Sequence, residues 1–338
     1  MPEHGQTYFA EPPICFIGRF GKHLLSRLLT DQTLAHNISW QTNQYEALGE
    51  GYGCCESIKV RFISGDHSNV LTPRVNKSVE EQDKRSRDKA EVFTPSWVCN
   101  KQNNLIDDQW FGKPGTFNTE TDNGWNPSDS AVQYPKGKTW RDYVLLNRLE
   151  VSCGEAPYLT SRYDTVTGEY IPVKRRIGLL DRKLRVITEN CGLPAEWKPW
   201  ATKAVQSIYG YDWQGDNVLL ARENILFSVA EAYQDAFFVP LSNDDLLSFA
   251  HVISWNIWQM DGIKGVIPNS CHDIPEPQLQ YEQVSLFAEE VTKETKMIPC
   301  EGCKTGNIHK HTGIYCKIMD WETHKAIPFA DIMKEAQK

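Results

Sequence analysis

The sequence predicts an α/β protein of 338 residues, in which a twisted, mostly parallel sheet carries helices on both faces between about residues 90 and 270. Two observations support this fold class, the alternation of strands and helices and one long amphipathic stretch. Short apolar stretches typical of buried strands alternate with helical stretches, the order that produces parallel sheets. We expect neighbouring strands near 148–152, 208–212, 237–241 and 251–255. The most regular stretch begins near residue 216 and has apolar residues at helical spacing: Val218, Leu219, Ala221, Ile225, Leu226 and Val229.

The segments on either side of this central region have a different texture. Residues 1–89 contain short apolar runs broken by Gly, Asn and Ser, and they predict a small α+β region. That region ends in "KSVEEQDKRSRDKAE" (77–91), a charged stretch without hydrophobic period that predicts a linker or an exposed helix. Residues 271–338 form a tail rich in cysteine and histidine. We therefore divide the chain at 1–89, 90–270 and 271–338.

Composition limits the kinds of partner and the compartment. The net charge of −8 disfavours non-specific binding to a polyanion, because nucleic-acid backbones are contacted mainly by Lys and Arg. No apolar run approaches the ~20 residues that cross a bilayer, and the start lacks the basic-then-apolar pattern of a signal peptide. We expect a cytoplasmic protein with no membrane partner. Its ten cysteines are then expected to be reduced thiols or metal ligands.

Several segments suggest a cofactor site at the strand ends. "VFTPSWVCN" (92–100) precedes the first predicted strand. "LEVSCGEAPYL" (149–159) places an acid, Glu150, before a small Cys-Gly turn, and Ala156 stands where many nucleotide-type loops have a second glycine. Alanine is tolerated close to a ligand when its φ is negative and is strained when φ is positive. "YGYDWQGDNVLLAREN" (209–224) ends a strand on Asp212 and leads into a helix.

The order of these segments resembles the catalytic domain of adenine-N6 DNA methyltransferases, closest to the modification subunits of restriction–modification systems. The resemblance covers about residues 90–270. It implies a Rossmann-like sheet that binds S-adenosylmethionine (AdoMet). The implied cofactor residues are Thr94, Pro95, Glu150, Cys153, Gly154, Ala156, Asp212, Trp213 and Asp244.

Within this resemblance, an acid at the end of the second strand would bind both ribose hydroxyls, since a carboxylate accepts two hydrogen bonds. Asp212 fits through its flanking residues, although it lies well beyond the roughly twenty residues usual for such an acid. Asp181 in "GLLDRK" is the alternative, and residues 160–198 would be an insertion beside the cofactor loop. Asp244 or Asp245 would lie near the adenine ring.

The catalytic segment of the family, Asn-Pro-Pro-Tyr, corresponds to "VISWNIWQ" (252–259). Asn256 would accept hydrogen bonds from the target amino group, and Trp258 would hold the flipped base. Both prolines are replaced, by Ile257 and Trp258, and Gln259 occupies the tyrosine position. The alternative interpretation of this segment is an ordinary buried strand.

The tail predicts a zinc site. "CEGCKTGNIHKHTGIYC" contains a Cys-x-x-Cys pair, two histidines and a final cysteine. Zinc takes four tetrahedral ligands, usually thiolates and imidazoles. We expect a structural ion bound by Cys300, Cys303, Cys316 and either His309 or His311, with Cys271 and His272 in reserve. The alternative is a set of reduced thiols.

These observations leave three functional hypotheses. The first is an AdoMet-dependent adenine-N6 DNA methyltransferase-like subunit, which needs a specificity or restriction partner because little chain remains for reading bases. The second is a catalytically inactive subunit that kept the cofactor fold for binding or regulation. The third is an AdoMet-dependent enzyme that acts on something other than duplex DNA.

Overall fold

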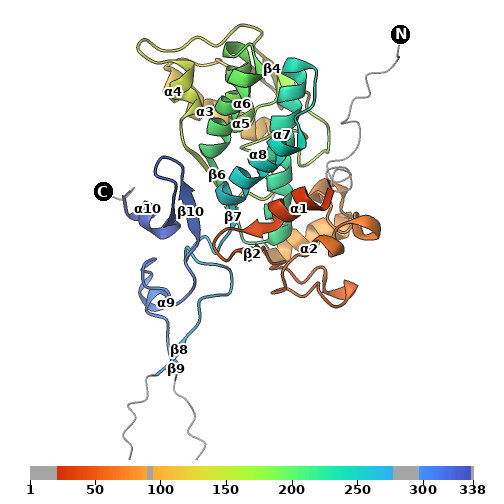
Figure 1. Ribbon diagram of the computed structural model, residues 1–338, viewed down its shortest axis with the longest axis vertical. Helices are drawn as coiled ribbons and strands as arrows, with labels where there is room; N and C mark the ends of the chain where they lie inside the picture. The colour runs from red at the N-terminus through yellow and green to blue at the C-terminus, as the bar shows by residue number, and fades with distance from the viewer. Residues whose placement is uncertain (1–20, 90–93, 277–296, 336–338) are drawn as a thin grey trace, which may run out of the picture.

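A three-stranded parallel sheet lies at the centre of the protein (Figure 1). This computed structural model describes residues 21–89, 94–276 and 297–335. The strands are β5 (Arg148–Val151), β6 (Ile208–Asp212) and β7 (Ile257–Gln259), in the order β5-β6-β7. The register pairs Glu150 with Gly210, and Asp212 with Gln259. The expected strands at 148–152 and 208–212 are therefore confirmed as parallel neighbours.

Four helices pack in one core against one face of this sheet. They are α5 (Leu179–Asn190), α6 (Pro194–Gln206), α7 (Gly215–Phe237) and α8 (Asn243–Asn256). Ile208 and Ile257 are fully buried and join the helices in this larger core. Each crossover between neighbouring strands contains two helices, α5 and α6 before β6, and α7 and α8 before β7. Helix α7 is buried along almost its whole length, which explains its continuous apolar pattern.

On the opposite face of the sheet, the C-terminal segment covers β6 and β7, whereas Leu149 and Val151 of β5 are exposed; in the described part of the chain no second layer of long helices lies there. This segment contains β9 (Met297–Ile298), α9 (Glu301–Thr305), the antiparallel pair β10 (Lys317–Asp320) and β11 (Lys325–Pro328), and α10 (Phe329–Glu335). Strand β9 pairs with β8 (Ile274–Pro275). Tyr211 and Trp258 from the sheet form a second, smaller core with Ile318 and Phe329 from this segment.

The N-terminal region contributes to the larger core. It contains α1 (Gly21–Leu29), β1 (Thr30–Asp31), β2 (His36–Asn37), four short 3-10 turns (Glu46–Leu48, Val60–Phe62, Gly65–His67 and Arg74–Asn76) and α2 (Val79–Lys89). Leu29 and Trp40 are fully buried in the core that the central helices form. Gly215 marks the closest approach, because a Cβ there would lie 2.0 Å from the carbonyl oxygen of Ser39. Within the charged stretch 77–91, residues Val79–Lys89 form helix α2.

The segment before β5 forms helix α3 (Ser96–Phe111), the antiparallel pair β3 (Asn118–Thr121) and β4 (Gly124–Pro127), and helix α4 (Trp140–Val144). A 3-10 turn, Val173–Arg175, precedes α5. Among the described residues, no helix combines the length and the apolar character that crossing a membrane requires.

Two of the four expected strands are wrong. Residues 251–255 lie inside α8, and residues 239–242 have no regular structure after α7 ends. The physical reason is a helix-start signal at Ser242, whose hydroxyl accepts a hydrogen bond from the backbone N–H of Asp245 while the Asp245 carboxylate caps Ser242 in return. The apolar residues at 251–255 belong to the buried face of this helix, and a short apolar run of this kind has the same composition as a buried strand.

Candidate cofactor pocket and metal centre

A cavity of about 980 Å³ lies at the carboxyl ends of β5 and β6. The loop after β5 and the end of β6 form its wall, because the carboxyl ends of parallel strands meet at one edge of a sheet. The backbone N–H of Gly154 donates to Oδ2 of Asp212 at 3.0 Å, and Oδ1 of Asp212 accepts from the N–H of Gln214 at 2.9 Å. The predicted cofactor loop and the predicted ribose acid therefore lie side by side.

Two buried carboxylates line this cavity. Glu150 accepts hydrogen bonds from the backbone N–H groups of Tyr158 and Leu159 at 3.3 and 3.2 Å. Burial, with a smaller contribution from the charge of Asp212, raises the pKa of Glu150 to about 8, although those two hydrogen bonds lower it. Burial likewise raises the pKa of Asp212 to about 6. A ligand that brings positive charge or hydroxyl donors would stabilise both carboxylates.

The loop of Ser152–Ala156 has an unusual backbone. Ser152, Gly154 and Ala156 have φ values of 51°, 52° and 62°, so alternate residues are left-handed. Ala156 is fully buried, and its carbonyl oxygen accepts from the N–H of Leu159 and of Thr160. The left-handed conformation costs a non-glycine residue about 1–2 kcal/mol. Alanine at this position therefore holds a strained turn.

The remaining predicted cofactor residues divide into two groups. Thr94, Cys153 and Trp213 line the cavity, and Trp213 is 37% exposed. Pro95 precedes helix α3 and lines a neighbouring cavity of about 500 Å³. Asp244 is exposed in the first turn of α8 and is not among the residues that line the cofactor cavity.

The two alternative acids have structural roles elsewhere. Asp245 pairs with Lys198 and caps α8. Asp181 accepts from the N–H of Ser161 and of Gly178, and it borders a separate cavity of about 350 Å³. Of the candidate ribose acids, Asp212 is the one at the cofactor cavity.

The structure contradicts the catalytic role expected for Asn256. Its side chain is fully buried, and Nδ2 donates to the carbonyl oxygens of Val205, Gln206 and Ile208 at 2.9, 3.0 and 2.8 Å. Its Oδ1 accepts from Nε1 of Trp321 at 2.8 Å. Asn256 ends α8 immediately before β7, so it lies at the amino end of the sheet, whereas the cofactor cavity lies at the carboxyl ends. Asn256 therefore does not line that cavity.

Trp258 is also unavailable to a flipped base. It is 4% exposed, and its ring packs against Tyr211 and Phe329 with centroid distances of 5.7 and 5.3 Å. Its position in β7 directs the side chain into the smaller core under the C-terminal segment. The expected assignment of Trp258 to a base pocket is therefore wrong.

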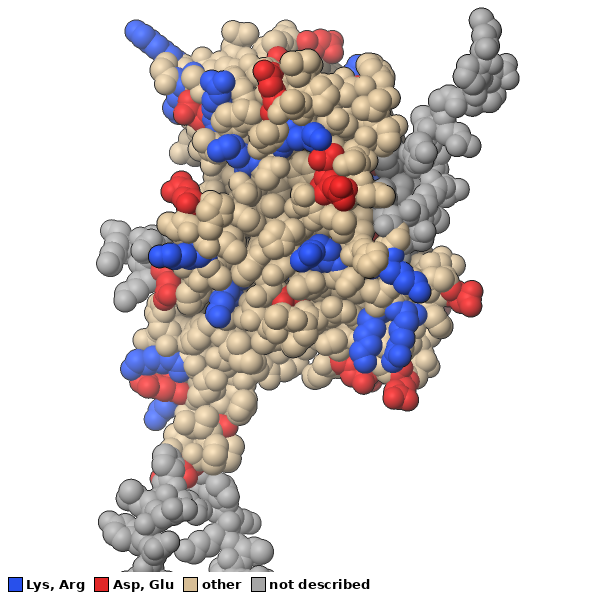
Figure 2. Space-filling view, in the orientation of Figure 1, with Lys and Arg blue, Asp and Glu red and all other residues tan. Residues whose placement is uncertain are grey.

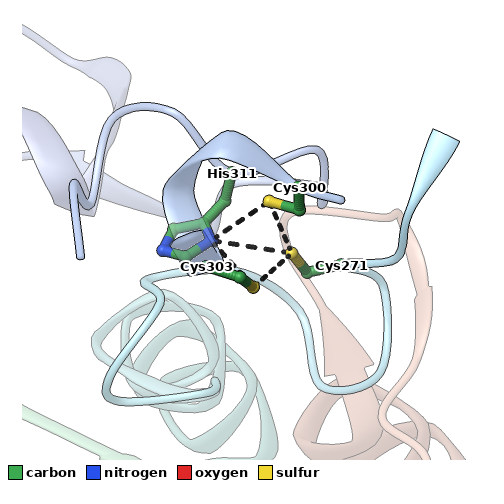
Figure 3. A group of neighbouring side chains, drawn as sticks. All are labelled: Cys271, Cys300, Cys303 and His311. Carbon is green, nitrogen blue, oxygen red and sulfur yellow. Dashed lines mark hydrogen bonds between the residues drawn. The ribbon is translucent and has the colours of Figure 1, made fainter. Parts of the chain in front are cut away.

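Four side chains in the tail form a Cys₃His group: Cys271, Cys300, Cys303 and His311 (Figure 3). Sγ of Cys271 lies 3.4 Å from Sγ of Cys300 and 3.7 Å from Sγ of Cys303. Nδ1 of His311 lies 3.6 to 3.7 Å from all three sulfurs. A tetrahedral ion with Zn–S near 2.3 Å and Zn–N near 2.0 Å separates its ligand atoms by about 3.5–3.8 Å. The group therefore has the dimensions of a metal site.

Two features of the chain shape this group. Cys300 and Cys303 lie at the start and within the first turn of α9, which brings both sulfurs to one side. Gly302 between them allows the imidazole to approach, because a Cβ there would lie 2.6 Å from Nδ1 of His311.

One expected ligand is wrong, and one reserve residue takes its place. Cys316 is fully buried in the smaller core, where its thiol lies 3.4 Å from the carbonyl oxygen of Gln259. The fourth side chain of the group is Cys271 from "NSCHDIP". His311 belongs to the group, whereas His309 faces Asp331 and His272 faces the carbonyl oxygen of Ser270.

Comparison with known proteins gives no relative. No family model, no curated protein and no solved structure matches the chain.

Proposed function

We propose that the protein is an AdoMet-binding subunit of the adenine-N6 DNA methyltransferase type, acting in a restriction–modification or related DNA-modification system. The observation that carries the proposal is Asp212 at the carboxyl end of β6, hydrogen-bonded to Gly154 of the loop after β5 in a shared cavity. A carboxylate there can accept from a ribose diol, and the glycine loop lets a ligand approach the backbone. This favours a Rossmann-like interpretation of the parallel sheet.

In this proposal, a residue other than Asn256 accepts the hydrogen bond from the target amino group during methyl transfer. Methyl transfer from a sulfonium needs alignment and a group that polarises the target amine, and Asn256 and Trp258 are both committed to packing. We infer that a partner subunit brings that group and reads the DNA sequence. Over the described part of the face in Figure 2, Lys and Arg are interspersed with Asp and Glu and form no continuous basic surface, which favours a partner that supplies phosphate contacts. Without such a partner the protein would serve as a binding or regulatory subunit.

Calorimetry with AdoMet tests the cofactor assignment. Asp212→Ala should weaken binding by about 1–3 kcal/mol, the loss expected for hydrogen bonds to a charged group. Asp244→Ala is the matched control, because Asp244 is an exposed acid outside the cavity and its loss should leave affinity unchanged. Failure of the wild type to bind AdoMet would overturn the proposal.

A methylation assay then separates the three functional hypotheses. Transfer to DNA in the presence of co-purifying subunits supports the DNA methyltransferase assignment. Binding without transfer supports the regulatory subunit, and transfer confined to RNA or protein supports a different substrate.

A second proposal concerns the metal. We propose that the Cys₃His group holds one structural Zn²⁺, because thiolate and imidazole ligands select zinc and all four tetrahedral positions are filled by protein. Metal analysis of protein purified without chelators should give one zinc per chain. Cys271→Ser should lose it and Cys316→Ser should retain it. The opposite result would restore Cys316 as the ligand.

A further inference from the structure

We propose that the metal centre clamps the C-terminal segment onto the outer face of the sheet and, through that face, holds the wall of the cofactor cavity. The clamp rests on the zinc proposed above, and its effect on the cofactor rests on the proposed AdoMet site. The ligands come from two parts of the chain: Cys271 follows the loop that leaves β7, and the other three belong to the C-terminal segment. An ion bound by both parts joins them.

The two parts run alongside each other between the metal group and the sheet. The N–H of Ile267 donates to the carbonyl oxygen of Ile314 at 2.8 Å, and the N–H of Cys316 donates to that of Gly265 at 3.1 Å. Val266 and Tyr315 form a bridge between them. An ion at one end of this pairing would fix its register up to Cys316, where the segment enters β10.

The segment then covers strand β7 directly. Trp258 and Met260 are 4% and 1% exposed because Cys316, Ile318 and Phe329 pack over them. On its other side, the end of β7 contacts Asp212, which lines the proposed cofactor cavity. The N–H of Met260 donates to the carbonyl oxygen of Asp212 at 3.0 Å.

A second contact reaches the same wall. Nε2 of Gln259 donates to the carbonyl oxygen of Trp213 at 2.8 Å, while the carbonyl oxygen of Gln259 lies 3.4 Å from the thiol of Cys316. The C-terminal segment and the cofactor acid are therefore separated by one short strand.

The apolar attachment of this segment is small. Among the described residues, its buried members of the smaller core are Cys316, Ile318 and Phe329, with Ile327 and Ile332 partly buried beside them and Trp321 packed against the larger core. Burial of so few side chains offsets little of the conformational entropy that is lost when the residues of the segment become ordered. Small units with so little core depend on a cross-link such as a metal.

Hydrogen exchange measured by mass spectrometry tests the clamp. The variant is Cys303→Ser, because Cys303 is an exposed member of the group whose sulfur makes no core contact. Lys304→Ala is the matched control, an exposed residue of the same helix that does not belong to the group. In the variant, backbone amides of 257–260 and 314–320 should exchange about tenfold faster or more, while those of α5 and α7 keep their protection. The control should match the wild type.

Removal of the ion from wild-type protein with a chelator gives the same comparison without a substitution. The faster exchange should appear on removal and reverse when Zn²⁺ is added back. Unchanged exchange at 257–260 and 314–320, in protein shown to have lost the ion, would overturn the clamp.

The two proposals fail separately. AdoMet affinity of the ion-free protein should fall severalfold as exchange at 257–260 rises. A wild type that binds no AdoMet refutes the cofactor assignment but leaves the exchange result to decide the clamp. Faster exchange with unchanged AdoMet affinity would refute the link from the clamp to the cavity.

Discussion

Replacement of Asn256 should destabilise the fold and not act as a selective loss of catalysis. The side chain caps the end of α6, whose last carbonyl groups have no partner within the helix. Asn256→Ala leaves the buried carbonyl oxygens of Val205, Gln206 and Ile208 without this donor, and Trp321 without its acceptor. The amide has two N–H groups and one accepting oxygen, so about three hydrogen bonds are lost. At roughly 0.5–1.5 kcal/mol for each, we expect the free energy of unfolding to fall by about 1.5–4.5 kcal/mol.

Urea denaturation followed by circular dichroism measures this loss, with Asn147→Ala as an exposed control that should stay within about 0.5 kcal/mol of the wild type. Asn256→Asp sharpens the test. It keeps an acceptor for Trp321 but turns a carboxylate toward three carbonyl oxygens, so it should cost more than alanine. An aspartate variant as stable as the wild type would refute the capping role.

Three further outcomes follow from the cofactor loop and the metal group. Ala156→Gly should change the free energy of unfolding by less than about 1 kcal/mol in thermal melts, because relief of the left-handed φ of 62° offsets the loss of a buried methyl group. AdoMet affinity, measured by calorimetry, should rise between about pH 6 and pH 8. Burial raises the pKa of Glu150 to about 8 and the pKa of Asp212 to about 6. Below these pH values the two carboxyl groups are protonated, so binding of the AdoMet cation must displace their protons. An affinity that does not change with pH would contradict this. Gly302→Ala should lower zinc content, because its Cβ would lie 2.6 Å from Nδ1 of His311; full occupancy would contradict that reasoning.

Each strand that the sequence predicts correctly is followed by a signal that ends it. Arg148–Val151 ends in a Cys-Gly turn, and Ile208–Asp212 ends before a helix start, so their lengths are bounded. The run at 251–255 has no such boundary, and a short apolar run fits a buried strand and a buried helix equally well. The decisive signal was Ser242 with Asp245 three residues later, a capping box that predicts a helix through the whole run.

The catalytic assignment failed for a reason that composition cannot show. Whether a polar residue lies at the cofactor edge depends on which end of its strand it occupies. Asn256 precedes β7 and Gln259 ends it, a difference of three positions that reverses the edge of the sheet. Strand boundaries are the least certain part of any prediction from one sequence.

The sequence could predict the three ligands of the metal group that lie close together in the chain, but not the fourth. Cys300, Cys303 and His311 lie close together in the chain, and their spacing is typical of zinc ligands. Cys271 comes from a distant segment, and only the pairing of 265–270 with 312–316 brings it to the site. The same pairing directs Cys316 inward to the core, which no spacing rule could indicate.

Asp212 and Gly154 lie side by side at the carboxyl edge of the sheet, although they are far apart in the chain. The usual spacing of roughly twenty residues between a glycine loop and the ribose acid assumes a crossover with one helix. Here the crossover contains α5 and α6, and Gly154 and Asp212 are 58 residues apart yet hydrogen-bonded at 3.0 Å. Residues 160–198 therefore belong largely to the crossover itself. Adjacency of β5 and β6 places the acid, so an acid that ends the neighbouring parallel strand is the better candidate whatever its distance in the chain.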